Sequence, residues 1–422
     1  MIAILLAALA AAAPVVAAPI PAAQALRLKL RPGAEGKLCL ECHAPFKAKL
    51  KQAFVHAPVR GNNCTGCHNP HASEHGKLLG ADKEKLCLTC HEDVLPEKAK
   101  SMHQPFVAGN CTGCHDPHAS DNKFELLKPG AQVCNSCHAA ITTAAGQAKH
   151  KHLEKGQVAC TTCHDAHASA KGEHLLKGDD PALCLGCHQP DKAFATAHMS
   201  YPVQKARCTT CHDPHGSNKK AMLYETLHKP VANKQCKDCH ADPTSARPFE
   251  TKAVGAALCS GCHAAEMARM LDKPQVHWAV TDEKACLNCH SAHGSRQRGL
   301  IKGNMKAVCA TCHSDTIARQ DRSVTKHKPV EDGDCTACHS PHSSETALLM
   351  KKADTTVMCR TCHDWQKHAS HPLGAALKDP RNKNLVLDCL SCHRAHGTEY
   401  KHMNPYPTTT ELCTKCHESF KR

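Results

Sequence analysis

One short motif, C-x-x-C-H, recurs throughout the 422-residue sequence: two cysteines separated by two residues and followed directly by histidine. All 32 cysteines fall in this motif, so it occurs sixteen times and no cysteine is left over. The pairs are Cys39 and Cys42, Cys64 and Cys67, Cys87 and Cys90, Cys111 and Cys114, Cys134 and Cys137, Cys160 and Cys163, Cys184 and Cys187, Cys208 and Cys211, Cys236 and Cys239, Cys259 and Cys262, Cys286 and Cys289, Cys309 and Cys312, Cys335 and Cys338, Cys359 and Cys362, Cys389 and Cys392, and Cys413 and Cys416. Any fold of this chain must therefore bring two thiols and an imidazole together at sixteen places.

This motif is the attachment site of c-type haem. Two thiols three positions apart lie on one face of a helical turn and can bond the two vinyl groups of one porphyrin, while the adjoining histidine binds the iron. We therefore predict sixteen covalent haem c groups, each with its iron. The proximal histidines are His43, His68, His91, His115, His138, His164, His188, His212, His240, His263, His290, His313, His339, His363, His393 and His417. A zinc array would group cysteines in fours, and neither zinc nor a disulfide framework explains a histidine after every pair.

The composition supports cofactors as the core. Aromatic residues make up only 3% of the sequence, with two Trp and four Tyr, which is too little to fill ordinary cores in a chain of this length. The net charge of +14 would by itself suggest nucleic acid or an acidic membrane surface. Because each haem adds two propionates, we expect the lysines and arginines to neutralise these groups. The sequence shows no concentrated basic patch or aromatic stacking platform, so we expect no nucleic-acid partner.

The motifs alternate in two kinds, which gives a two-haem repeat of about 48 residues. One unit reads histidine, about seven residues, C-x-x-C-H-x-x-H, a leucine-rich stretch, and a second, plainer C-x-x-C-H. Units begin at an upstream histidine, namely His56, His103, His152, His198, His228, His277, His327 and His371, and the motif at Cys39 is the second half of a truncated leading unit.

Two units depart from this pattern. The fourth unit lacks a second motif, and the fifth has Pro243 where the others have a trailing histidine. We predict that these departures mark a joint between an N-terminal lobe, residues 26–227 with haems 1–8, and a C-terminal lobe, residues 228–422 with haems 9–16.

The remaining histidines supply candidate distal ligands. Besides the upstream set, the trailing histidines are His71, His118, His167, His215, His293, His342 and His396, and His402 completes sixteen. Four others, His75, His150, His174 and His368, are expected on the surface.

A trailing histidine lies three positions after a proximal one, on the same helical face, so the two cannot bind opposite sides of one iron. Each trailing histidine is therefore expected to ligate a different haem and to draw successive haems together. The ten methionines follow no repeat position, which favours bis-histidine ligation and low potentials.

The fold class expected is mostly irregular, with short α-helices and little β structure: an elongated multihaem cytochrome c built from two-haem repeats with haems as the core. Residues 1–25 form an apolar run with small residues, typical of a signal peptide. A membrane anchor is the alternative for this segment, but Pro14, Pro19 and Pro21 argue against it. We expect an exported protein.

The repeat, with "CTGCHNPHAS" or "CTTCHDPHGS" followed by a leucine-rich stretch and another C-x-x-C-H, resembles the doubled-CXXCH multihaem cytochromes. It is especially similar to the decahaem electron-conduit cytochromes of the MtrA type. That resemblance implies a haem wire inside an outer-membrane β-barrel, which takes electrons from periplasmic donors and passes them to other cytochromes or to an acceptor outside the cell.

The function predicted is long-range electron transfer without bond-making chemistry, and no catalytic residue is assigned. Three alternatives stay open: a soluble periplasmic shuttle, an extracellular filament formed by self-association, and a multihaem reductase of nitrite, hydroxylamine or a sulfur oxyanion. A reductase would need an iron with an open position, and Pro243 marks the place where a ligand is missing from the repeat.

Overall fold

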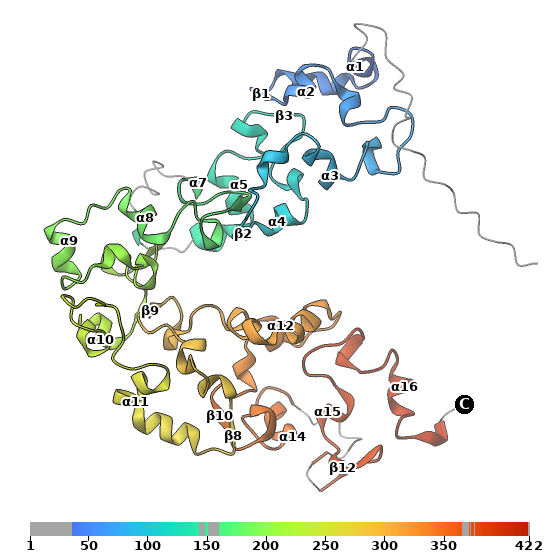
Figure 1. Cartoon of the computed structure of the whole chain (residues 1–422). Helices are drawn as coiled ribbons and strands as arrows, with labels where there is room; N and C mark the ends of the chain where they lie inside the picture. The colour runs from blue at the N-terminus through green and yellow to red at the C-terminus, as the bar shows by residue number, and fades with distance from the viewer. Residues whose placement is uncertain are drawn as a thin grey trace, which may run out of the picture. The chain divides into compact units, whose positions relative to one another are not determined.

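Short helices and turns make up most of the regular structure (Figure 1). The computed structural model describes residues 36–142, 148–150, 160–364, 371, 373–374 and 376–420. The α-helices are α1 Cys39–Cys42, α2 Ala57–Arg60, α3 Lys83–Leu88, α4 Gln104–Val107, α5 Ala131–Thr142, α7 Cys160–Cys163, α8 Asp180–Leu185, α9 Lys192–Ala197, α10 Lys229–Ala232, α11 Ala256–Leu271, α12 Met305–Arg322, α13 Lys328–Glu331, α14 Thr355–Arg360, α15 Cys389–Cys392 and α16 Thr409–Cys413. The expectation of short helices, little strand and a mostly irregular backbone is confirmed. The signal peptide expected at residues 1–25 lies outside the described residues.

Many of the remaining turns are 3₁₀ helices. They are η2 Ala44–Lys51, η3 Cys64–Gly66, η4 Gly76–Leu78, η5 Glu92–Val94, η6 Cys111–Gly113, η7 Lys123–Glu125, η8 Glu173–Leu175, η9 Val203–Lys205, η10 Cys208–Thr210, η11 Lys220–Met222, η12 Cys236–Asp238, η13 Trp278–Val280, η14 Ala285–Asn288, η15 Arg298–Leu300, η16 Cys335–Ala337, η17 Ala347–Leu349, η19 Lys401–Met403 and η20 Glu418–Phe420.

Each C-x-x-C-H motif contains one helical turn. The backbone N–H of the histidine donates to the carbonyl of the first cysteine, as from His68 to Cys64 at 3.0 Å, which is the hydrogen bond of one α-helical turn. The first motif of a unit is an isolated turn, such as η3. The second motif lies within a longer helix, as in α11 and α12 (Figure 1).

The strands are very short and pair antiparallel. They are β1 Phe54–Val55, β2 Ser101–Met102, β3 Ala119–Ser120, β4 Ala148–Lys149, β5 Ala168–Ser169, β6 Gly216–Ser217, β7 Thr226–Leu227, β8 Gln275–Val276, β9 Gly294–Ser295, β10 Ser343–Ser344, β11 Lys378–Asp379 and β12 Asn382–Val386. The pairs are β1 with β3, β2 with β5, β4 with β6, β7 with β9, β8 with β10, and β11 with β12.

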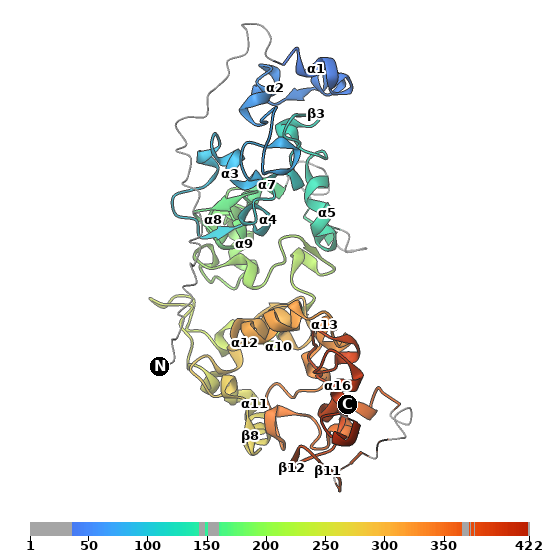
Figure 2. The same ribbon diagram turned by 90° about the vertical axis from the view of Figure 1, so that its right-hand side faces the viewer.

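All of these pairs except the β11–β12 hairpin, whose two strands are labelled in Figure 2, join two repeats. The strand just before the upstream histidine of one unit pairs with the strand just after the trailing histidine of the next. Thus Val276, which precedes His277, is opposite Ser343, which follows His342. This register places an upstream histidine of one unit beside a trailing histidine of the next.

Side chains alone form almost no apolar core. Within the described residues, the buried apolar side chains are Val55, Ala119, Ala168, Tyr201, Ala279, Ala285 and Met358, and five of these seven are alanine or valine. Large apolar side chains such as Phe124 and Leu348 are 63% and 82% exposed. The chain therefore surrounds the expected cofactors and does not form a hydrophobic core from its side chains alone.

Two compact units are present, Met1–Val94 with His103–Ser136, and Leu95–Met102 with Cys137–Arg422. The lobe boundary that we expect at residue 228 stays a prediction.

Candidate haem-binding sites

Histidine rings meet in pairs in the described part of the chain. One ring of each pair follows a C-x-x-C motif, and the other comes from an upstream or trailing position. The ring centres of these pairs are 5.7 to 6.2 Å apart.

Proximal histidines of first motifs face the trailing histidine of the following unit. His118 lies 6.1 Å from His68 of the preceding unit, although it is three residues from His115. The same relation joins His164 to His215, His240 to His293, His290 to His342, and His339 to His396. The trailing histidine thus serves the preceding unit's motif, as the helical-face argument requires.

Proximal histidines of second motifs face the upstream histidine of their own unit. The pairs are His91 with His56, His188 with His150, His263 with His228, His313 with His277, His363 with His327, and His417 with His371. The two rules assign distal partners that sequence spacing alone left open.

The spacing within the pairs fits one metal ion between two imidazoles. A metal–imidazole bond is about 2 Å long, so two such bonds plus about 1 Å from each nitrogen to its ring centre give about 6 Å. Nε2 of His327 lies 3.4 Å from Nε2 of His363, so these two nitrogens face each other. With the two motif thiols close by, the residues fit a bis-histidine haem c.

Hydrogen bonds fix which nitrogen faces the partner ring. Nδ1 of proximal His212 donates to the carbonyl of Ala221 at 2.8 Å, and the equivalent bond recurs from His68 to Lys77 at 2.9 Å. Nδ1 of upstream His277 donates to the carbonyl of Pro341 in the next unit, at 2.9 Å. Because Nδ1 carries the proton, the lone pair of Nε2 remains available for iron.

The leucine-rich stretch supplies the carbonyl that orients the proximal histidine. In unit after unit it makes a left-handed turn, with positive φ at Lys77 and Leu78, Phe124 and Glu125, His174 and Leu175, Ala221 and Met222, Leu348 and Leu349, His402 and Met403, and Gly299 and Leu300. Left-handed backbone is unfavourable for residues other than glycine, so its recurrence indicates a turn held by its surroundings.

A buried serine after the trailing histidine closes this turn, and the sequence analysis missed it. Ser120 Oγ donates to the carbonyl of Leu126 at 2.6 Å, and Ser169 Oγ donates to that of Leu176 at 2.5 Å. The side chains of Ser169 and Ser217 are almost fully buried, each 1% exposed. The repeated triplets "HAS" and "HGS" were the available signal.

Burial keeps the trailing histidines neutral. It lowers the pKa of His118, His215, His293, His342 and His396 from the usual histidine value. Neutral imidazole is the form that binds iron.

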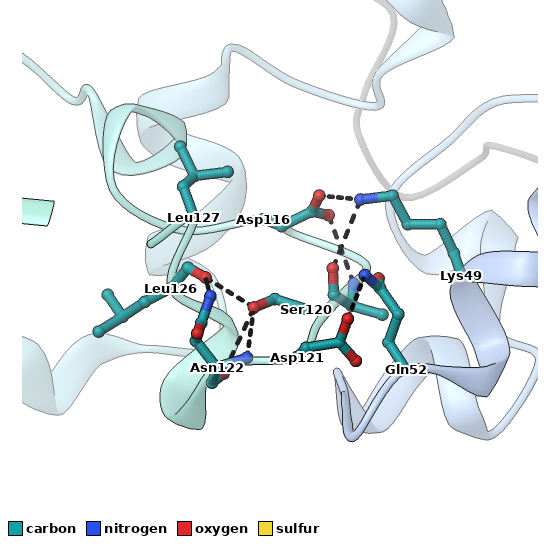
Figure 3. A pocket seen from close by; sticks show the side chains of 9 residues that line it. Lys49, Gln52, Asp116, Ser120, Asp121, Asn122, Leu126 and Leu127 are labelled. Atoms are coloured by element: carbon teal, nitrogen blue, oxygen red, sulfur yellow. Dashed lines mark hydrogen bonds and ion pairs between the residues drawn. The ribbon is translucent and has the colours of Figure 1, made fainter. Parts of the chain in front are cut away.

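Asp116 lines a polar hollow together with Lys49, Ser120 and Asp121 (Figure 3), and it also positions the trailing histidine. Its Oδ1 accepts from the backbone N–H of His118 at 3.0 Å, and its other oxygen pairs with Lys49. Asp213 holds the N–H of His215 in the same way, at 3.1 Å, and pairs with Arg296. A cation from another unit therefore neutralises each of these carboxylates.

His150 corrects the sequence assignment. We expected His152 as the upstream histidine and His150 as a surface residue, but His150 directly follows β4, as His277 follows β8, and its ring lies 5.9 Å from His188. The register of β4 and this ring contact favour His150. His152 lies outside the described residues, as does His368.

Other expected ligands are not brought to a second imidazole. No histidine ring contact is recorded for His43, His71 or His402 among the described residues, and the backbone carbonyl of His402 accepts from Nδ1 of His393 at 2.8 Å. Of the expected surface histidines, His75 Nδ1 lies 3.0 Å from Asp82, and His174 occupies a left-handed turn position. Distal ligation by His103 and His167 stays a prediction.

Thiols of neighbouring motifs contact one another in chain order. In each of the following pairs, the first cysteine of a second motif lies beside the first cysteine of the next motif, and the neighbouring thiol contributes to the raised pKa of one member: Cys39 and Cys64, Cys87 and Cys111, Cys184 and Cys208, Cys259 and Cys286, Cys309 and Cys335, and Cys359 and Cys389. Burial raises the pKa of Cys67, Cys163, Cys239 and Cys338. A thiol of the next motif adds to this shift in each case, namely Cys90, Cys184, Cys262 and Cys362, but Asp238 and Asp334 contribute more than the thiol at Cys239 and Cys338.

Packing of the helices agrees with these contacts. The second-motif helix α3 packs against η6 of the next unit, α8 against η10, α11 against η14, and α14 against α15. Between α8 and η10, the buried carboxylate of Asp180 accepts from the N–H groups of Cys208 and Thr209, at 2.8 and 3.2 Å. Asp180, Cys184 and Cys208 lie close enough to resemble a metal site, but the carboxylate is used as a cap and both cysteines belong to haem motifs.

A family model of the doubled CXXCH motif matches residues 56–95, 103–143, 150–193, 201–227, 228–268, 277–318, 327–368 and 384–422, more than half of the chain. The chain belongs to the doubled CXXCH family. It is a multihaem c-type cytochrome with about 16 covalently bound haem c groups, and the family implies electron transfer.

The third family match starts at residue 150, the histidine that faces His188. No curated protein matches the chain. Multihaem c-type cytochromes are typically exported. Among the described residues, we find no helix with the length and apolar character needed to span a bilayer.

Proposed function

We propose that this doubled CXXCH cytochrome conducts electrons in single file, through haem sites that follow one another in the order of the chain. The proposed path leads from periplasmic donors to an acceptor at the outer membrane or outside the cell. The observation that carries the proposal is the succession of contacts between neighbouring motifs, since thiols bonded to adjacent haems can touch only if those haems are close together.

The histidine pairs suit such a path. Each bound haem c supplies an iron that takes up and releases one electron. The chain holds the proximal histidines of first motifs, and the upstream His56, His228 and His277, through Nδ1, which limits movement of these ligands when the charge of the site changes. Only electrons pass from the donor to the acceptor, and each electron lost by one is gained by the other. The proposed function therefore needs no transfer of a proton or a chemical group.

The proposed partners are an outer-membrane β-barrel and other cytochromes, on the strength of the resemblance to electron-conduit cytochromes. An irregular backbone exposes N–H and C=O groups that lipid cannot satisfy. A chain of this kind would therefore need a surrounding protein in order to cross a membrane.

A histidine lies at the position where the reductase alternative expected an open iron. The sequence suggested a vacancy associated with Pro243 in the fifth unit, but His198 lies 6.1 Å from His212, the motif affected by that change.

Single-file order can be tested by interrupting it. In the holoprotein attached to an electrode by its C-terminus, Cys286→Ser with Cys289→Ser should leave the haems of earlier motifs reduced much more slowly than in wild type. The matched control removes the motif at the far end of the file, Cys39→Ser with Cys42→Ser, and should leave all remaining haems rapidly reduced. Equally rapid reduction of every haem in the Cys286 variant would contradict the proposal, provided that mass analysis shows a single haem missing.

A further inference from the structure

The fourth and fifth units each lack one part of the repeat, and the missing parts are complementary. The fourth unit has no second motif, so its upstream His198 has no partner of the regular kind. The fifth unit has Pro243 in the trailing position, so His212 of the fourth unit receives no trailing histidine. One ligand and one proximal site are thus left over in adjoining units.

The structure brings these two histidines together. The rings of His198 and His212 are 6.1 Å apart, which matches the regular pairs, but their planes are inclined by 61°. At first-motif sites that use a trailing histidine the inclination is 9° to 36°. The partner of His212 therefore approaches with a different ring orientation.

We propose that His198 is the distal ligand of the haem bound by Cys208 and Cys211, in place of the trailing histidine that the fifth unit lacks. This inference rests on the proposed function only in assuming that the haems are bis-histidine electron carriers. It makes this haem the one first-motif site, among the described pairs, whose distal ligand comes from its own unit.

Hydrogen bonding prepares His198 for this role. Its Nδ1 donates to the carbonyl of Phe194 at 2.8 Å, within its own helical turn, and the Phe194 ring lies 4.5 Å from the imidazole. Since Nδ1 of His212 donates to Ala221, both rings keep Nε2 free of a proton. Regular upstream histidines such as His277 instead donate to the next unit.

In regular units a strand before the upstream histidine pairs with the next unit, and at His198 a helix and side-chain contacts take the place of this pairing. Helix α9 precedes His198, whereas His56, His103, His150, His228 and His277 each directly follow a two-residue strand. Asp191 caps α9 by accepting from the N–H of Phe194 at 2.8 Å. Beyond the histidine, buried Tyr201 donates its hydroxyl proton to the carbonyl of Ala241 at 2.7 Å, and its ring lies 5.8 Å from that of Phe249. The segment is thereby anchored to the fifth unit two residues before Pro243.

Spectroscopy of holoprotein variants tests the assignment. His198→Ala should retain every covalent haem by intact mass, yet convert one haem equivalent per chain to high spin in the ferric state and bind one carbon monoxide when reduced. Met199→Leu is the matched control, since it changes the neighbouring thioether, and it should leave the spin state of every haem as in the wild type. His118→Ala is the positive control for loss of a regular distal ligand.

Two further variants keep the test decisive if His198→Ala folds poorly. His198→Met should retain six-coordination and raise the potential of one haem, because methionine ligation raises haem potentials. Adding Pro243→His to His198→Ala should restore low spin, because the repeat directs a trailing histidine to the preceding unit's first motif.

The assignment is overturned if His118→Ala opens a haem while His198→Ala leaves the spin state of every haem as in the wild type, or if His198→Met changes no potential. Failure of the proposed function would look different: wild-type protein without bis-histidine low-spin haems, or without single-file reduction.

Discussion

Hydrogen bonds to Nδ1 decide which nitrogen each histidine presents to its partner. Proximal histidines of first motifs, such as His68, donate to a carbonyl of the left-handed turn, and the upstream His56, His228 and His277 donate to a carbonyl beside the next unit's trailing histidine. These imidazoles are therefore oriented by a backbone atom that belongs to the repeat itself. Geometry of this kind survives variation of the side chains around it, because the carbonyl is present whatever residue occupies the position.

The trailing histidines provide the sharpest test at this scale. Because His118 faces His68 at 6.1 Å, His118→Ala should open the haem bound by Cys64 and Cys67 without preventing its attachment. One high-spin haem equivalent is expected in the electron paramagnetic resonance spectrum. A high-spin haem located instead at the motif of Cys111 and Cys114 would show that the rule joining consecutive units is wrong.

Arg296 gives a prediction about stability. The Asp213 side chain is 5% exposed and pairs with Arg296, so Arg296→Ala would leave a buried carboxylate without its cation. Since the arginine is itself half exposed, we expect a loss of about 2 kcal/mol rather than the full cost of breaking a buried pair. Hydrogen exchange of residues 213–217 measures this loss. Arg296→Lys should retain part of the stability, and equal exchange in all three proteins would exclude the pair as a stabilising contact.

Among individual residues, the sequence predicted the types of ligand but not every position. The thiols and proximal histidines follow from the motif, and the helical spacing excluded a trailing histidine from its own haem. The choice between His150 and His152 depends on the register of a two-residue strand, which leaves no clear trace in composition. Arg296 reaches Asp213 across 83 positions of sequence, a contact that periodicity cannot reveal.

At the scale of elements, pairs of two-residue strands join successive units at regular positions. Such strands would be marginal by themselves, and the buried serine and the left-handed turn stabilise them from one side. The short helices were predictable because the motif needs a helical turn. The strands were not predictable, because two residues are too few to show the alternation of apolar and polar side chains that marks a strand.

The left-handed turns can be tested with opposite substitutions at equivalent positions. Ala221 has φ of 57° and Gly299 has φ of 66°. Ala221→Gly should stabilise its turn by about 1 kcal/mol, because glycine accepts positive φ without strain. Gly299→Ala should destabilise its turn by a similar amount, since no atom lies within 4 Å of the added Cβ and only the backbone strain remains.

Local hydrogen exchange of the N–H groups of Tyr224 and Lys302, which donate to Cys211 and Cys289, reports these changes. Effects of the same sign in both variants would mean that packing, rather than φ, controls the turn.

For the whole molecule, the contacts between motifs favour one continuous path over clusters of haems. From the motif at Cys160 to that at Cys413, thiol contacts or helix packing connect each motif to the next within one compact unit. The link between the irregular units is part of this series, since Cys211 lies beside Cys236. With His198 in place of the missing trailing histidine, the haem of Cys208 and Cys211 keeps two histidine ligands, and the path continues where the repeat changes.

The last prediction concerns the cellular partner and rests on the proposed conduit. A backbone that is mostly irregular cannot face lipid, so the protein should reach the outer membrane only through a barrel that surrounds it. Fractionation of cells should recover the protein with outer membranes when such a barrel is co-expressed, and in the periplasmic fraction without it. The matched control is the barrel co-expressed with an unrelated periplasmic cytochrome, which should remain periplasmic. Recovery of the protein alone as extracellular filaments would contradict the conduit and favour self-association, because the path would then continue from one copy of the chain to the next.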